Sequence, residues 1–73
     1  NSSEELFDEC NKSFNRHSLE RVRELVAGKG ADVNWQNKKV YNQTGFMWAC
    51  MWNHVETVKY LMTIDTINVN LIS

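Results

Sequence analysis

One unit of sequence occurs twice in this chain of 73 residues, and the repetition limits the folds that the chain can form. Residues 22–26 and 58–62 carry apolar side chains at the same spacing, and each stretch is followed at the same distance by a short ending. The endings are Ala31-Asp32-Val33-Asn34 and Ile67-Asn68-Val69-Asn70, which lie 36 residues apart. Two copies of one unit at a fixed period indicate a repeat solenoid, in which each unit buries its apolar face on a neighbour.

The second copy predicts two helices joined by a tight turn. Thr44 can cap a first helix that runs from residue 45 to about residue 52. Asn53 suits a left-handed turn position, and a second helix is expected from residue 55 to about residue 63.

The first copy shows the same pattern. Ser2 and Glu5 fit a capping box that opens a helix to about residue 12. Ser18 can cap a second helix, whose apolar stripe begins at Leu19. The sequence therefore predicts an all-α fold.

The segment between the copies has no helical period. Residues 35–43 contain two Asn residues, which tolerate positive φ, so an extended finger with a turn is expected there. The predicted organisation is one domain, with repeat one at about 2–34, the finger at about 35–43 and repeat two at about 44–70.

These motifs resemble the ankyrin repeat family. Gly30-Ala31-Asp32-Val33-Asn34 is identical to the family ending G-A-D-V-N, and the second copy, TGFMWACMWNH at residues 44–54, is similar to T-P-L-H-x-A-A-x-x-G-H. Val58, Leu61 and Met62 stand where the family has its V-x-x-L-L stripe. The resemblance implies a solenoid of stacked helix–turn–helix repeats with hairpin fingers on one side, in the N-terminal part of a longer ankyrin-repeat protein.

The chain departs from the family pattern at several positions. Gly45 replaces a Pro, Met47 replaces the His that usually bonds neighbouring hairpins, and Asn53 replaces a turn Gly. In the first copy, Phe7 and Cys10 take the roles of Phe46 and Ala49, with about three extra residues in the turn at 13–17. Such irregularity is typical of a terminal repeat.

The charge balance excludes some classes of partner. Eight Lys and Arg residues oppose nine Asp and Glu residues, and the net charge of −1 argues against nucleic-acid and anionic membrane surfaces. No apolar stretch approaches the roughly 18 residues of a membrane helix, and the N-terminus is unlike a signal peptide. We expect an intracellular, cytoplasmic location and, since the chain begins with Asn1, a longer parent protein.

The cysteines and histidines do not predict a metal site. Cys10, His17, Cys50 and His54 lack the short paired spacings of zinc ligands. We expect both cysteines to be reduced and to occupy small, buried helix positions, with both histidines in turns. Because no nucleophile, base and oxyanion donors fall together, and no Gly-rich loop opens a helix, we expect neither catalysis nor a cofactor.

The candidate binding residues are aromatic, basic and Met side chains. Trp48 is expected to pack between repeats, whereas Trp52 ends its helix at a variable, exposed position typical of a binding anchor. The predicted site for another protein comprises Trp35, Gln36, Lys38, Lys39, Val40, Tyr41 and Gln43 of the finger, with Met51 and Trp52 of the first helix. The basic finger favours an acidic partner surface.

Two other functions stay open at this point. The segment could belong structurally to a larger enzyme, such as a GTPase-activating protein or a kinase, or it could mediate self-association. Leu71 and Ile72 lie where a third finger should begin, and Val55, Tyr60 and Met62 have no following helix pair to cover them. We therefore expect further repeats, or another chain, on the C-terminal face.

Overall fold

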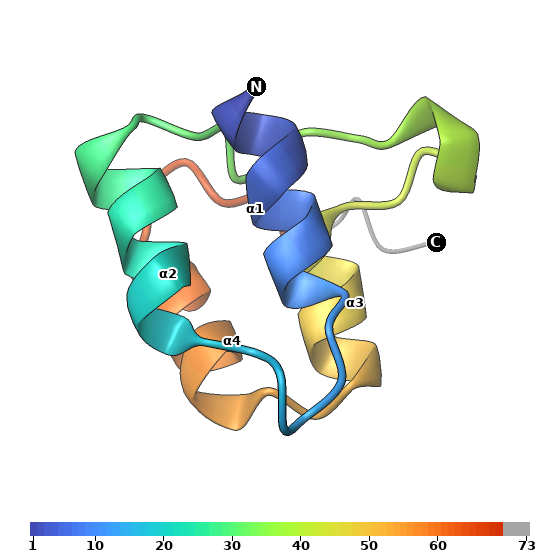
Figure 1. The fold of residues 1–73 in the computed structure, drawn as a ribbon. Helices are drawn as coiled ribbons and strands as arrows, with labels where there is room; N and C mark the ends of the chain where they lie inside the picture. The colour runs from blue at the N-terminus through green and yellow to red at the C-terminus, as the bar shows by residue number, and fades with distance from the viewer. Residues whose placement is uncertain (70–73) are drawn as a thin grey trace.

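The four α-helices of residues 1–69 form two antiparallel pairs in the computed structural model, which describes these residues (Figure 1). The first pair is α1 (Ser2–Cys10) and α2 (Leu19–Arg23), which continues as a π-helical turn, η1 (Glu24–Gly28). The second pair is α3 (Gly45–Met51) and α4 (Val55–Met62), and between the pairs lies a 3-10 turn, η2 (Lys38–Val40).

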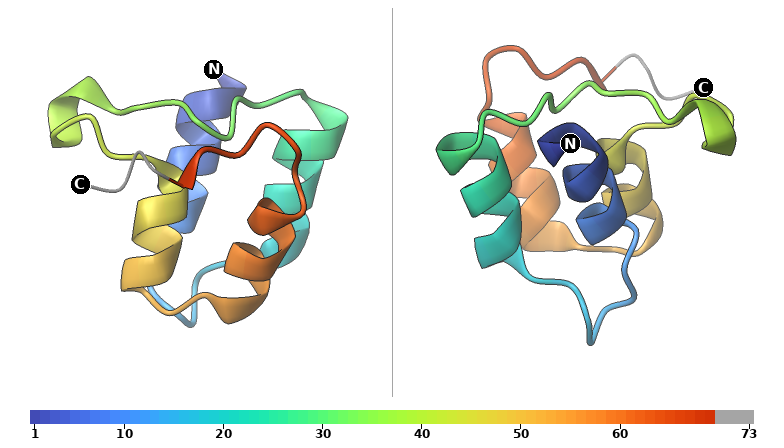
Figure 2. Two further views of the ribbon diagram at one scale, coloured as in Figure 1. Left: turned by 180° about the vertical axis from the view of Figure 1, so that it is seen from behind. Right: turned by 45° about the horizontal axis from the view of Figure 1, so that its top comes forward.

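The two pairs stack on each other. Helix α1 packs on α3, and α2 packs on α4. The finger leaves the end of η1, passes the N-terminus of α1 and projects from one edge of the stack (Figures 1 and 2). Residues 1–69 contain one isolated antiparallel bridge and no strand.

The expected all-α stack of helix pairs is confirmed. The predicted repeat boundaries, at about 2–34, 35–43 and 44–70, remain predictions. Asn70, with which the second unit was expected to end, lies outside the described residues, as do Leu71 and Ile72.

Local capping starts three of the helices. The Ser18 hydroxyl accepts a hydrogen bond from the backbone N–H of Arg21, and the Thr44 hydroxyl accepts one from that of Met47, each at 3.3 Å. Asn53 adopts a left-handed conformation with φ 61° between α3 and α4. These expectations from sequence are confirmed. The capping box at Ser2 is wrong: Ser2 is already helical, and the Asn1 side chain accepts the N–H of Glu4 at 2.9 Å.

The core lies between the two pairs. Its side chains come from all four helices and from the segment after η1, and the buried members include Leu6, Val22, Leu25, Ala31, Val33, Phe46, Ala49 and Leu61. Gly30 has φ 67°, a conformation that glycine adopts without strain, and it turns the chain from η1 back across this core.

Gly45 lies where α3 packs tightly against α1. A Cβ atom at this position would lie 3.2 Å from the Cys10 sulfur and 3.3 Å from the Cys10 Cβ. The absence of a side chain at Gly45 therefore allows the two helices to pack with a cysteine between them.

The finger contains a turn, as expected. The bridge between Asn37 and Gln43 closes it, and the Asn37 side chain accepts the backbone N–H of Lys39 at 2.9 Å. Tyr41 and Asn42 both adopt positive φ, 55° and 58°. The sequence did not indicate the 3-10 turn η2, because its three residues are too few to show a helical period.

The two cysteines have different environments. Cys10 is fully buried, and burial followed by the charge of Glu9 raises the pKa of its thiol to about 12. Cys50 is exposed. The expectation that both thiols are buried was wrong for Cys50, because its side of α3 faces away from α1 and no described helix covers it.

This difference predicts two rates of thiol modification. With a disulfide-exchange reagent at about pH 8, one thiol per chain should react in the native state, and the second only after denaturation. The native thiol should disappear in a Cys50→Ser variant and persist in Cys10→Ala. Two equally fast native thiols would contradict the placement of Cys10.

None of the helices in residues 1–69 combines the length and the apolar character that crossing a bilayer requires.

Candidate functional site

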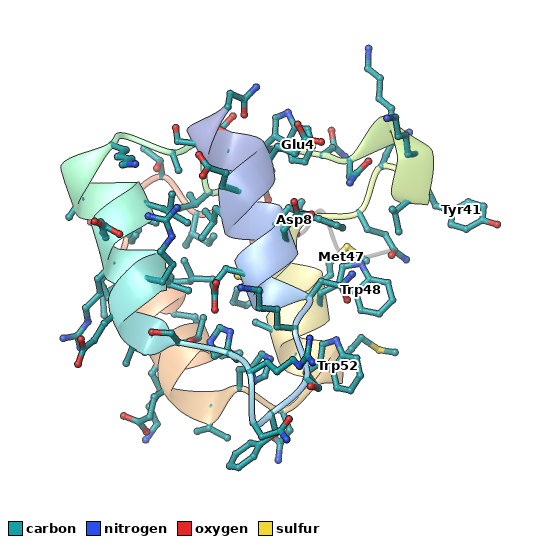
Figure 3. The ribbon with its side chains drawn as sticks, viewed as in Figure 1. Glu4, Asp8, Tyr41, Met47, Trp48 and Trp52 are labelled. Atoms are coloured by element: carbon teal, nitrogen blue, oxygen red, sulfur yellow. The ribbon has the colours of Figure 1, made fainter. Side chains whose placement is uncertain are left out.

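Helix α3 presents large side chains on the side of the stack from which the finger projects. Met51 is 75% exposed and Trp52 is 42% exposed, whereas Gly45, Phe46 and Ala49 face the core. Residues three and four apart share one face of a helix, so Trp48 and Trp52 point to the same side. Figure 3 shows both indoles there.

The two indoles of α3 differ in their bonding. The Trp52 N–H donates to the Asn11 side-chain oxygen at 3.1 Å, which ties the exposed ring to the end of α1. Trp48 is half-buried, in part agreement with the expected core position. Its indole nitrogen is buried and has no acceptor within residues 1–69.

The finger residues divide into an anchor and a tip. Trp35 is half-buried and packs edge-on against Phe7 of α1, with ring centroids 6.0 Å apart, so it holds the base of the finger. Tyr41 is 90% exposed and points away from the helices (Figure 3). Of the other predicted site residues, Gln36, Lys38 and Lys39 are exposed, and Val40 and Gln43 are half-buried.

The predicted site residues thus form two groups. One is the exposed finger tip with Tyr41, and the other is the exposed side of α3 with Met51 and Trp52. Trp35 lies at the base of the finger as a structural contact with α1. We call the finger tip together with this side of α3 the finger face.

Sequence reasoning missed the contribution of α1 to this face. The structure separates the four carboxylates of α1 into two groups. Glu9 is buried and Glu5 pairs with Arg21 at 3.0 Å, whereas Glu4 and Asp8 are exposed on the side of the finger (Figure 3). The spacing of four residues between Glu4 and Asp8 was the available signal.

A second cluster joins the helix–helix turns of the two pairs. The rings of His17 and His54 stack with centroids 3.8 Å apart and an interplanar angle of 9°. His54 is buried, and its Nε2 lies 2.7 Å from the backbone oxygen of Lys12. Both histidines follow helix–helix turns, as expected, but the sequence did not indicate that they meet.

Two hydrogen bonds hold the His17 ring. Its Nδ1 donates to the backbone oxygen of Glu9 at 2.8 Å, and its Nε2 lies 2.6 Å from the Thr57 hydroxyl. The Glu9 carboxylate accepts from Lys12 at 2.9 Å and from the backbone N–H of Ser18 at 2.7 Å. The cluster therefore connects α1, the start of α2 and α4 through the two imidazole rings.

The protonation of His54 is disfavoured in the folded state. Burial lowers the pKa of His54 and outweighs the Lys12 carbonyl, which raises it; His17 lowers it further and Glu9 raises it. Every bond in this cluster has a structural role, and no group of three or more His, Cys, Asp or Glu side chains in residues 1–69 is placed to hold a metal ion. That the protein binds no metal stays a prediction.

Comparison with known families supplies one match. The family model described as "Ankyrin repeats (3 copies)" matches residues 10–72, which include α2, the finger, α3 and α4. Most of α1 precedes the matched span. No curated protein and no solved structure matches the chain.

Proposed function

Because the chain belongs to the ankyrin repeat family, we propose that it is a non-catalytic module that binds another protein through the finger face. Ankyrin repeats are generally protein–protein interaction modules. The observation that carries the proposal for this chain is the exposure of Met51, Trp52 and Tyr41 on one side of the stack. Aromatic and Met side chains are enriched in protein interfaces, where a few of them supply most of the binding energy.

The state of the thiols supports a non-catalytic role. A cysteine nucleophile needs an accessible thiolate with a lowered pKa. Cys10 is inaccessible with a pKa of about 12, and burial also raises the pKa of Cys50. Neither side chain therefore has the character of a nucleophile.

The proposal can be tested by affinity purification from the source cells with the whole chain as bait. Met51→Ala and Tyr41→Ala remove an apolar and an aromatic side chain from the finger face. Met62→Ala and Phe14→Ala are the matched controls, because Met62 is 59% exposed on α4 and Phe14 is 80% exposed in a turn. Thermal melts should be alike for all four variants, since exposed substitutions usually stay within about 0.5 kcal/mol.

We expect at least one protein to be retained by the wild type and both controls and lost by both finger-face variants. If only the control variants lose the retained protein, the interface lies on the opposite side of the stack. If the only retained protein is the chain itself, self-association is the function, and sedimentation equilibrium should then show a dimer that dissociates on dilution.

A further inference from the structure

Helix α1 carries two carboxylates beside the finger face that no cation of the described chain pairs with. Within residues 1–69, Glu4 and Asp8 form no ion pair. The other two carboxylates of α1 are paired, Glu5 with Arg21 at 3.0 Å and Glu9 with Lys12 at 2.9 Å. The unpaired carboxylates lie on the finger side of the helix, and the paired ones face α2.

The placement of Asp8 is unfavourable for the stability of α1, whereas Glu4 lies in the first turn, where the helix dipole favours a negative charge. Like charges four residues apart on a helix repel each other by about 0.2–0.5 kcal/mol. Asp8 also lies in the last turn of α1 (Ser2–Cys10), where the helix dipole disfavours a negative charge. A cation from outside the chain would relieve both effects.

The cations near Glu4 and Asp8 do not form ion pairs with them in the described residues. Asp8 borders a hollow of about 160 Å³ in which Glu5, Asp8 and Glu9 oppose Lys12 and Arg21, and both of these cations are bonded to other carboxylates. Glu4 borders a hollow of about 170 Å³ together with Trp35, Lys38 and Lys39 of the finger, and it forms no ion pair with either lysine. Carboxylates therefore outnumber cations around Asp8, whereas two lysines lie near Glu4.

The indoles of α3 continue the face below these carboxylates. In Figure 3, Glu4, Asp8, Trp48 and Trp52 follow one another down the same side of the molecule. Indole rings accept the aliphatic stems of Lys and Arg, and they attract the cations themselves. Along this side, two acidic residues are thus followed by two aromatic ones.

The spacing of the carboxylates also restricts the ligand. Glu4 and Asp8 are one helical turn apart, about 6 Å along the axis. Residues i and i+2 of an extended chain are separated by about 6.6 Å and point to the same side. An extended segment with basic residues at alternate positions would place one cation on each carboxylate.

We propose that the occupant of the finger face is an extended basic segment of the partner protein, with Lys or Arg at positions i and i+2 over Glu4 and Asp8 and an apolar residue next to them over Trp48 and Trp52. The proposal deepens the proposed function, on which it rests, by stating the chemistry of the partner. It also revises the expectation of an acidic partner, which took account of the finger lysines alone.

The test is a selection of random peptides of about twelve residues, displayed on phage, against the whole chain. We expect Lys or Arg at alternate positions in the selected peptides. The strongest peptide should bind the Glu4→Gln, Asp8→Asn double variant about tenfold more weakly, measured by tryptophan fluorescence in low salt. The control is Glu20→Gln with Asp65→Asn, which removes two exposed carboxylates on other segments, and it should bind like the wild type.

Each other outcome overturns the inference. Selected peptides rich in Asp or Glu would assign the face to an acidic partner bound by the finger lysines. Apolar peptides without a basic residue, or equal losses in both double variants, would exclude a specific role for Glu4 and Asp8. If the selection yields no binding peptide, the inference fails, whereas the proposed function fails only if Met51→Ala and Tyr41→Ala also leave the purified partner unchanged.

Discussion

A Gly45→Ala substitution should destabilise the chain by about 1–3 kcal/mol, the usual effect of inserting a methyl group into a filled contact. The new Cβ would lie 3.2 Å from the Cys10 sulfur and 3.3 Å from the Cys10 Cβ, so Cys10 must shift by a few tenths of an ångström. A chain of this size has about 4–11 kcal/mol of stability, and the loss is a large fraction of it.

The same contact predicts a rescue. In the family pattern this position is Pro and the residue equivalent to Cys10 is Ala, so the chain combines a smaller residue on α3 with a larger one on α1. In a Cys10→Ala background the sulfur is absent and only the 3.3 Å contact with the Cβ atom remains, so Gly45→Ala should cost at least about 0.5 kcal/mol less than it does beside Cys10. The double-mutant cycle is measured by urea unfolding. Equal effects of Gly45→Ala in both backgrounds would show that the two residues are not coupled.

The second large effect is a loss of stability in acid. The pKa of His54 is lowered in the folded state, mainly by burial, so the unfolded chain binds a proton more readily. The stabilisation from neutral His54 is complete above the ordinary pKa of about 6.5 and is lost as the pH falls below it toward the folded value. The melting temperature should therefore fall between about pH 7.5 and pH 5.

The control for this prediction is His54→Gln. Glutamine can still donate a hydrogen bond to the Lys12 carbonyl but does not titrate, so this variant should melt lower at neutral pH and depend less on pH. A wild-type melting temperature that stays constant over this range, or a variant profile as steep as that of the wild type, would contradict the role assigned to His54.

The predictable features of this fold are those that depend on neighbouring residues. Ser18 and Thr44 cap helices through backbone groups three residues away, and Asn53 takes a left-handed turn through its own conformational preference. The repeat offset located both helix pairs. The same reasoning was wrong at Ser2, because Asn1 is an equally good cap one residue earlier.

The features that could not be predicted depend on how the helices are rotated against one another. Cys50 is exposed because it faces away from α1, and Glu9 is buried because it faces the turn before α2, where it bonds Ser18. The stacked His17 and His54 are distant in sequence and meet only in the folded stack. For the candidate site, the residue types of the finger and of α3 indicated recognition, but the part played by Glu4 and Asp8 required the three-dimensional arrangement.

Hydroxyl-radical footprinting of the chain with and without its purified partner shows whether the partner covers the finger face. Met51 and Met62 are both well exposed, at 75% and 59%, and lie on α3 and α4 respectively, so each reports one side of the stack by its oxidation. We expect the partner to protect Met51, Trp52 and Tyr41 and to leave Met62 as reactive as in the free chain. Protection of Met62 with unchanged oxidation of Met51 would contradict this expectation.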